Sequence, residues 1–218
     1  MKKHYILTAV AALALSFGSC SDFLERDPDQ ILTEDQVFGD ANMIKSVLAN
    51  YYGRVTWGQH INDSYAYILL DEACRSDGGP DNTQTFSDTQ WRVYDYGLIR
   101  NINQFLAGVR AAKVLDKDVQ LSIEGEARFL RAWTYFNMCR GMGGMPIVGD
   151  EVFEYKAGMD ITAMQYPRST EAELYDYIIK ECTEIAPLLS EAPSINGARA
   201  TKWAALMLKA RAALYAGS

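Results

Sequence analysis

Histidine is scarce in this chain of 218 residues, which contains only two, His4 and His60. His60 stands next to no acid or nucleophile motif, and the chain lacks Gly-x-Ser-x-Gly, His-Glu-x-x-His and a phosphate-binding glycine loop. These absences argue against the common serine hydrolases, zinc proteases and nucleotide-binding proteins, so we expect no enzymatic activity and no cofactor. Carboxylates are plentiful, however, and a glycosidase pair stays open from the sequence alone.

Cysteine is also rare, with four residues at Cys20, Cys74, Cys139 and Cys182. They lack the close spacing of a zinc site, and we expect no bound metal. Cys139 and Cys182 fall in helical patterns and are predicted to be small buried hydrophobes. If Cys20 carries a lipid, the other three allow at most one disulfide.

Basic residues are outnumbered, with 21 lysines and arginines against 28 acids and a formal net charge of −7. An acidic surface argues against binding to nucleic acid and against electrostatic docking on anionic lipid. Beyond the first apolar run, no stretch approaches the length needed to span a membrane. A hydrophobic content of 49% with 22% charged residues is ordinary for a folded globular protein.

The N-terminus has the order of a secretory signal. Two lysines precede an apolar run over residues 5–15, which is too short to span a bilayer, and small residues precede Cys20. Phe17 at position −3 is bulky for an ordinary signal peptidase, whereas a cysteine directly after Gly-Ser favours a bacterial lipoprotein signal over an ordinary secreted protein. We therefore predict that residues 1–19 are removed as a lipoprotein signal peptide. Acylated Cys20 would then anchor residues 20–218 to a membrane.

A series of helices is predicted in the rest of the chain. Capping boxes at Thr33–Gln36 and Thr170–Glu173 open two of them. Side chains at helical spacing, apolar except for Glu181, mark three further faces. These faces are Ile44, Val47, Leu48, Tyr51 and Tyr52; Leu98, Ile102, Phe105, Leu106 and Val109; and Leu174, Tyr177, Ile178, Glu181 and Ile185.

Two further helices resemble each other. One covers about residues 123–140 and is expected to stop at Gly141, and the other begins at Thr201. Ala127–Ala132 matches Ala205–Ala210 in its alanines, a leucine and a basic residue, 78 residues later, which is about two tetratricopeptide units. Their alanines let neighbouring helices approach closely. Because no stretch keeps a period of two, we predict an all-α, tetratricopeptide-like helix-hairpin bundle with irregular loops, in which Ile147–Tyr155 is extended at most.

The longest polar loop, punctuated by glycine and proline, runs from Arg75 to Thr89. Long irregular loops are usually functional or disordered. Carboxylate, amide and guanidinium groups suit the hydroxyls of sugars, and Phe86 or Trp57 provides a ring face for stacking. The alternative is a plain surface connection. The candidate ligand-binding residues are Arg75, Asp77, Asn82, Gln84, Phe86 and Trp57.

Motifs that occur in a single order cover nearly all of residues 20–218. They are Cys20–Glu25 with Pro28 and Thr33-Glu34; Trp91-x-x-Tyr94 followed by Asn103; Glu126–Phe136 leading to Gly143–Pro146; Pro167–Thr170; Arg199–Lys202; and Ala204–Ser218. Together they resemble the SusD/RagB family of outer-membrane nutrient-binding lipoproteins. Two departures, Met142 and Trp203, look like local packing changes.

This resemblance implies a protein that carries ligands and is no enzyme. Family members are lipid-anchored in the outer membrane at the cell surface, where they capture oligosaccharides, or in some cases peptides. They hand these ligands to a TonB-dependent barrel transporter. Family members are also much longer, so the chain is expected to hold their N-terminal helical part. Four residues of the last helix would then meet helices that lie outside this sequence: Leu206, Met207, Ala210 and Leu214.

Two other function classes stay open. Tetratricopeptide-like helices bind peptides and partner proteins in many settings, so the main alternative is a protein- or peptide-binding surface module without glycan binding. An unrecognised hydrolase is the third possibility, and a turnover assay on mixed polysaccharides separates it from a carrier. The lipoprotein signal at Cys20 favours the glycan-binding surface protein over a cytosolic repeat module.

Overall fold

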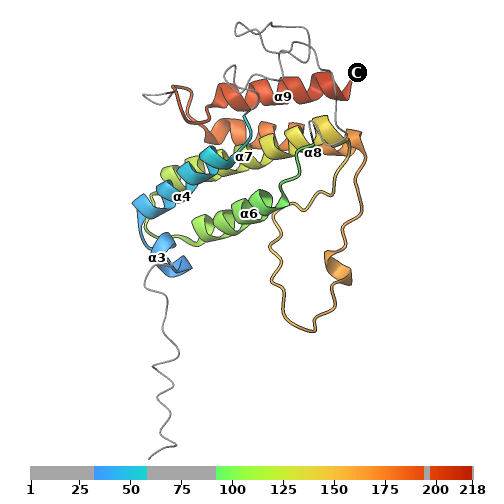
Figure 1. Ribbon diagram of the computed structural model, residues 1–218. Coiled ribbons are helices and arrows are strands. Elements are labelled where there is room, and N and C mark those ends of the chain that lie inside the picture. The colour runs from blue at the N-terminus through green and yellow to red at the C-terminus, as the bar shows by residue number, and fades with distance from the viewer. Residues whose placement is uncertain (1–31, 58–91, 194–196, 218) are drawn as a thin grey trace, which may run out of the picture. The chain divides into compact units, whose positions relative to one another are not determined.

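The computed structural model describes residues 32–57, 92–193 and 197–217 (Figure 1). The chain divides into two units, Met1–Thr33 and Glu34–Ser218, and the described helices all belong to the second. Cys20 and the loop from Arg75 to Thr89 lie outside the described residues. The acylation of the first and the ligand-binding role of the second therefore stay predictions.

The described residues form helices joined by irregular segments, and they contain no strand, which confirms the predicted all-α fold. None of these helices combines the length and the apolar character needed to cross a bilayer. The elements are α3 (Glu34–Phe38), α4 (Ala41–Arg54), α6 (Tyr96–Ala111), α7 (Lys117–Met142), α8 (Glu171–Ile185) and α9 (Lys202–Ala216), with 3₁₀ turns η2 (Thr162–Met164) and η3 (Ala186–Leu188).

The four longest connected helices pack in chain order. α6 packs on α7, α7 on α8 and α8 on α9, and neighbouring helices run in alternate directions (Figure 1). α4 packs across α7 and α6, and the short α3 contacts α4 and α6. This is the helix-hairpin arrangement that the stripes and the internal similarity predict.

The predicted apolar stripes form the core. On α4, Ile44, Leu48 and Tyr51 are buried, while Val47 and Tyr52 are partly buried against the same cluster. Every predicted stripe residue of α6 is buried, and so are Leu174, Ile178 and Ile185 of α8. A helix that places one apolar face against its neighbours gains most of its stability from that burial rather than from propensity.

Both ends of α7 differ from the prediction. The helix begins at Lys117 rather than near Ile123. In its first turns Gln120 is buried, and its Nε2 donates to the carbonyl of Val109, 2.6 Å away, at the end of α6. The buried contact there is made by a polar side chain, so the apolar spacing that predicts a helix is missing. The helix also passes through Gly141 and ends at Met142, and the C-cap residue Gly143 has a φ of 75°, in the left-handed region that favours glycine.

Two cysteines fall within the described residues, and both are free and buried as predicted. Burial raises the pKa of the Cys139 thiol to about 11 and that of Cys182 to about 12. Both thiols are therefore protonated at neutral pH and act as small apolar side chains.

The outer side of α9 corrects one expectation. Ala127 and Ala205 are buried where helices meet, but Ala210 is exposed and brings no described helix close. Trp203, Met207 and Leu214 are exposed by 58%, 64% and 76%. α9 therefore packs on α8 with one side and leaves an apolar stripe on the other.

Candidate ligand-binding site

The start of α6 presents three side chains on one face. The helix is capped by Asp95, whose Oδ1 accepts a hydrogen bond of 2.8 Å from the backbone N–H of Leu98. Tyr96, Ile99 and Arg100 follow at i, i+3 and i+4, which places them together on the helix surface. An aromatic ring, an aliphatic chain and a guanidinium thus stand side by side.

An irregular segment, residues 143–170, leaves the end of α7 and returns to the start of α8. Its two ends are tied together, because the Ser169 hydroxyl donates to the Met145 carbonyl at 2.6 Å and Arg168 donates to the carbonyls of Met142 and Gly144. Gly144 lies so close to the returning chain that a Cβ there would be 2.0 Å from the Ser169 carbonyl oxygen. We call residues 143–170 the excursion.

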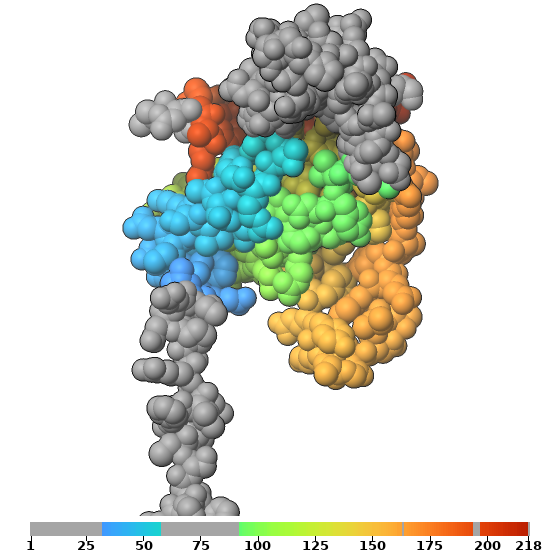
Figure 2. All heavy atoms as spheres, in the orientation of Figure 1, coloured from blue at the N-terminus to red at the C-terminus, as the bar shows by residue number. Residues whose placement is uncertain are grey.

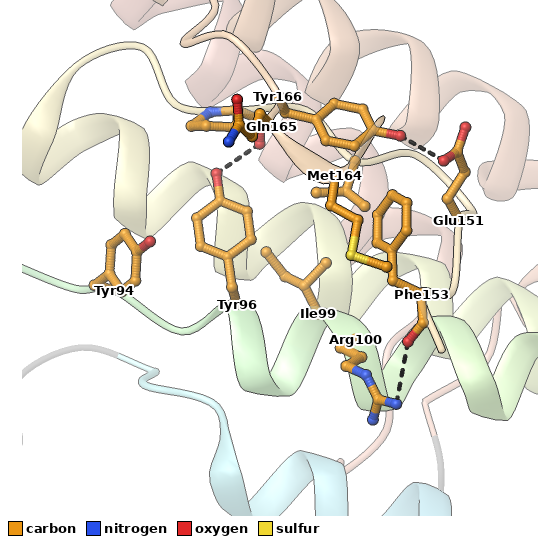
Figure 3. Close-up of a pocket in the computed structure, with 11 residues that line it drawn as sticks. Tyr94, Tyr96, Ile99, Arg100, Glu151, Phe153, Met164, Gln165 and Tyr166 are labelled. Atoms are coloured by element: carbon orange, nitrogen blue, oxygen red, sulfur yellow. Dashed lines mark hydrogen bonds between the residues drawn. The ribbon is translucent and has the colours of Figure 1, made fainter. Parts of the chain in front are cut away.

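A cavity of about 370 Å³ lies between the start of α6 and the excursion. Figure 2 shows the excursion, in yellow to orange, beside α6, in green, and Figure 3 shows the side chains that line the cavity. Its volume falls within the range of small-molecule sites. The lining residues are Tyr94, Tyr96, Ile99, Arg100, Pro146, Val148, Glu151, Phe153, Met164, Gln165 and Tyr166.

Four of the eleven lining residues are aromatic, and their rings meet in pairs. The ring centroids of Tyr94 and Tyr96 are 5.2 Å apart, and those of Phe153 and Tyr166 are 5.6 Å apart at 65°. Tyr94 is 69% exposed, so most of its ring is available to a ligand. These separations are those of favourable edge-to-face contacts, which hold the rings in place without covering all of their faces.

Hydrogen bonds fix the polar groups of the cavity. The Tyr166 hydroxyl donates to Glu151, the Tyr96 hydroxyl donates to the Pro146 carbonyl at 2.6 Å, and Arg100 donates to the Phe153 carbonyl at 3.4 Å (Figure 3). Burial raises the pKa of Tyr96, and the hydrogen bond to Glu151 raises the pKa of Tyr166. Both phenols stay protonated at neutral pH and act as donors.

This combination of groups suits a polyhydroxylated ligand. Ring faces pack against the apolar C–H face of a sugar, while a carboxylate, an amide and a guanidinium hydrogen-bond to hydroxyls. In the described ranges, no three His, Cys, Asp or Glu side chains gather as they would around a metal ion.

The sequence alone does not predict this cavity. Tyr94 stands out there only as part of a motif, and Phe153 and Tyr166 lie in a segment with no helical or alternating pattern. The available signal was the length of the excursion together with its aromatic content, since long irregular segments in compact domains are often functional.

Trp57 is the one predicted candidate residue that the structure describes. Its ring stacks on Tyr52 at 5.9 Å and on Phe129 at 6.4 Å, and its Nε1 donates to the Tyr52 carbonyl at 2.8 Å. It is 40% exposed and lines a second cavity of about 490 Å³ near Arg199. The other five candidates lie outside the described residues.

Comparison with known proteins places the chain in a family. The family described as "Starch-binding associating with outer membrane" matches residues 22–214. A SusD-like protein of Formosa agariphila is 26% identical over 198 residues, which cover 84% of this chain and 38% of that protein. The chain therefore spans well under half the length of this relative.

Solved structures share the fold. A SusD-like protein from Bacteroides fragilis has a TM-score of 0.62 at 24% identity, over 87% of this chain and 38% of that one. A laminarin-binding SusD-like protein has a TM-score of 0.58 at 18% identity, over 82% and 41%. With the family match over most of its length, the chain belongs to the SusD-like family.

Proposed function

We propose that this chain is part of a cell-surface lipoprotein that binds glycans and delivers them to a TonB-dependent outer-membrane transporter. The observation that carries the proposal is an aromatic cavity with fixed hydrogen-bonding groups, in a member of a family described as starch-binding at the outer membrane. The protein holds its ligand and passes it on without cleaving it.

The charges in the cavity favour a neutral glycan. Arg100 and Glu151 are the two charged residues of the lining, so the wall carries no net charge. Arg100 donates to Gln104 at 3.0 Å and to the Phe153 carbonyl, and it keeps further N–H groups for sugar hydroxyls. The Glu151 carboxylate accepts one hydrogen bond from Tyr166 and keeps further acceptor capacity for sugar hydroxyls. A wall without net charge gives uronates and sulfated sugars no electrostatic advantage over neutral sugars.

Removing a stacking ring is expected to weaken glycan binding. Calorimetric titration of the protein with maltooligosaccharides and with laminarin oligosaccharides should give a measurable affinity for at least one of these neutral glucans. Tyr94→Ala and Phe153→Ala should each lower that affinity about 5- to 30-fold, which corresponds to about 1–2 kcal/mol for a lost stacking partner. Tyr155→Ala is the matched control, because Tyr155 is 72% exposed in the same excursion and does not line the cavity.

The loop from Arg75 to Thr89 is the competing location of the site. If Tyr94→Ala and Phe153→Ala bind like the wild type while Asp77→Ala, Asn82→Ala or Phe86→Ala loses affinity, the glycan sits on that loop and not in the cavity. Trp57→Ala belongs to the same series, because its ring was predicted to stack on a sugar. Binding of peptides in place of every glycan would favour the alternative function, a peptide-binding surface module.

The lipid anchor gives a test of location. Cys20→Ala is expected to abolish labelling by a fatty-acid analogue and to leave unprocessed precursor, because the thiol is the acylation site of the predicted lipoprotein signal. The measurement is metabolic labelling followed by protease shaving of intact cells, with Ser21→Ala as the control. Equal labelling of the Cys20→Ala variant and the wild type would contradict the proposal.

A further inference from the structure

The amide side chain of Asn103 hydrogen-bonds to the backbone of the excursion near its start. The Nδ2 of Asn103, on α6, donates to the carbonyl of Gly149 and to that of Glu151, both at 2.9 Å. Its Oδ1 accepts a hydrogen bond of 2.7 Å from Arg131, on α7. Asn103 is 1% exposed, and its bond with Arg131 is buried, while its two bonds to the carbonyls are partly buried.

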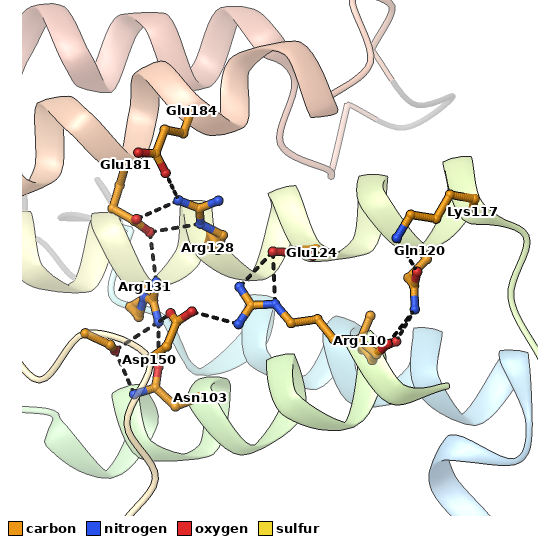
Figure 4. A network of polar contacts seen from close by, with 12 residues as sticks. Asn103, Arg110, Lys117, Gln120, Glu124, Arg128, Arg131, Asp150, Glu181 and Glu184 are labelled. Atoms are coloured by element: carbon orange, nitrogen blue, oxygen red, sulfur yellow. Dashed lines mark hydrogen bonds and ion pairs between the residues drawn. The ribbon is translucent and has the colours of Figure 1, made fainter. Parts of the chain in front are cut away.

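Arg131 completes the contact from the other side (Figure 4). Its guanidinium donates to the Gly149 carbonyl at 3.0 Å and to the Asp150 carboxylate at 2.6 Å. Arg110 reaches the other oxygen of Asp150 at 2.7 Å, and Glu181 on α8 accepts from Arg131 at 2.9 Å. Side chains from α6 and α7 therefore hold the backbone of residues 149–151, and α8 supports Arg131 through Glu181.

This hold lies next to the cavity. Glu151 exposes its side chain on the cavity wall and accepts the hydrogen bond of Tyr166, which comes from the far limb of the excursion. Phe153 follows two residues later and packs against the same ring. The position of the Glu151 backbone thus sets where a carboxylate and two aromatic rings stand.

We propose that Asn103 is a positioning residue for ligand binding: by fixing the carbonyls of Gly149 and Glu151, it sets the wall of the cavity formed by Glu151, Phe153 and Tyr166. Both N–H groups of one amide are needed, since each carbonyl takes one of them. An aspartate of the same shape offers no donor to either carbonyl. The part of this inference that concerns ligand affinity rests on the proposed glycan binding.

The first test needs no ligand. In NMR spectra of the full chain, Asn103→Ala is expected to shift the backbone carbonyl ¹³C resonances of Gly149 and Glu151 upfield and to leave those of α8 in place, because each of these carbonyls loses a hydrogen bond. Asn103→Asp, which keeps the volume, should do the same. Asn101→Ala is the matched control, since it removes the same kind of side chain from α6 and leaves Asn103 in place. Unchanged carbonyl resonances of Gly149 and Glu151 in both Asn103 variants would overturn the proposal.

The second test asks whether Asn103 acts through the cavity wall that it positions. Asn103→Asp is expected to lower the affinity for the neutral glucan about fivefold or more in the wild-type background. In a background that carries both Glu151→Ala and Phe153→Ala it should lower the affinity by no more than about twofold, because the side chains that this backbone positions are gone. Equal losses in the two backgrounds would show that Asn103 affects binding through general stability and would overturn the positioning role.

The two tests separate this inference from the proposed function. Shifted carbonyl resonances of Gly149 and Glu151, in a protein that binds neither glucan, support the hold by Asn103 and refute glycan binding. Glucan binding that is unaffected by both Asn103 variants supports the proposed function and refutes the positioning role.

Discussion

Replacing Glu181 with leucine is expected to lower the free energy of unfolding by about 1.5–3 kcal/mol, because it removes one of the two carboxylates that accept hydrogen bonds from the buried Arg131 guanidinium. Arg131 is 1% exposed, and Glu181 lies 2.9 Å from it and 2.7 Å from Arg128. Arg131 keeps Asp150, and Arg128 keeps Glu184, but leucine accepts no hydrogen bond from either arginine. Because leucine matches the size of the side chain, the loss comes from unsatisfied guanidinium N–H groups and not from a cavity.

Chemical denaturation followed by circular dichroism measures this effect. Glu184→Leu is the matched control, because Glu184 also pairs with Arg128, at 2.5 Å, but its side chain is 45% exposed. An exposed ion pair contributes at most about 1 kcal/mol, so the control should lose little. Similar losses in the two variants would show that burial of the Arg131–Glu181 pair adds no stability.

The contribution of Glu181 to stability is also expected to depend on pH. Burial alone would raise the pKa of Glu181, but hydrogen bonds from Arg128 and the charge of Arg131 hold it below its ordinary value of 4.5. A carboxyl group whose folded-state pKa is lowered contributes stability that is present above 4.5 and is lost as the pH falls through the lowered pKa. The wild type should therefore lose more stability than Glu181→Leu on going from about pH 5 to more acidic solution.

A protein made of residues 20–218 is expected to self-associate through α9. Trp203, Met207 and Leu214 are 58%, 64% and 76% exposed on one helix, and clustered exposed apolar side chains promote association. Sedimentation should show oligomers, and thermal unfolding should show a broad melting transition. Met207→Glu combined with Leu214→Glu should give a monomer, because the charges oppose burial of the stripe.

Ile161→Glu is the control for this prediction. Ile161 is 50% exposed in the excursion, away from α9, so its replacement should leave the oligomers unchanged. A strictly monomeric wild-type fragment with a sharp two-state melt would refute the prediction. Loss of the oligomers in the Ile161→Glu variant would place the contact on the excursion.

Local signals were sufficient to predict most helices. The capping box at α8 forms as predicted, with the Thr170 N–H donating to Glu173 at 2.8 Å and the Glu173 N–H donating to Thr170 at 3.2 Å. The stripes of α4, α6 and α8 became the core, because apolar periodicity and burial express the same preference. The start of α7 could not be predicted, since Gln120 is placed by a bond to another helix.

The cavity was beyond prediction for a related reason. Tyr94, Glu151 and Tyr166 are brought together by contacts between distant parts of the chain, and no local pattern in the excursion marks them. Glu181 did carry a signal, because a carboxylate in an otherwise apolar helical face indicates a buried partner. Its partner, Arg131, stood in the most specific motif of the sequence.

The tie at the base of the excursion has a consequence for how relatives can diverge. Because Gly144, Met145, Arg168 and Ser169 fix the distance between the two limbs, residues 152–165 form a closed insert whose length and sequence can change without moving α7 or α8. Lengthening such an insert costs little conformational entropy. With the ligand site proposed above, changes in this insert would alter the ligand preference while the helical scaffold stays the same.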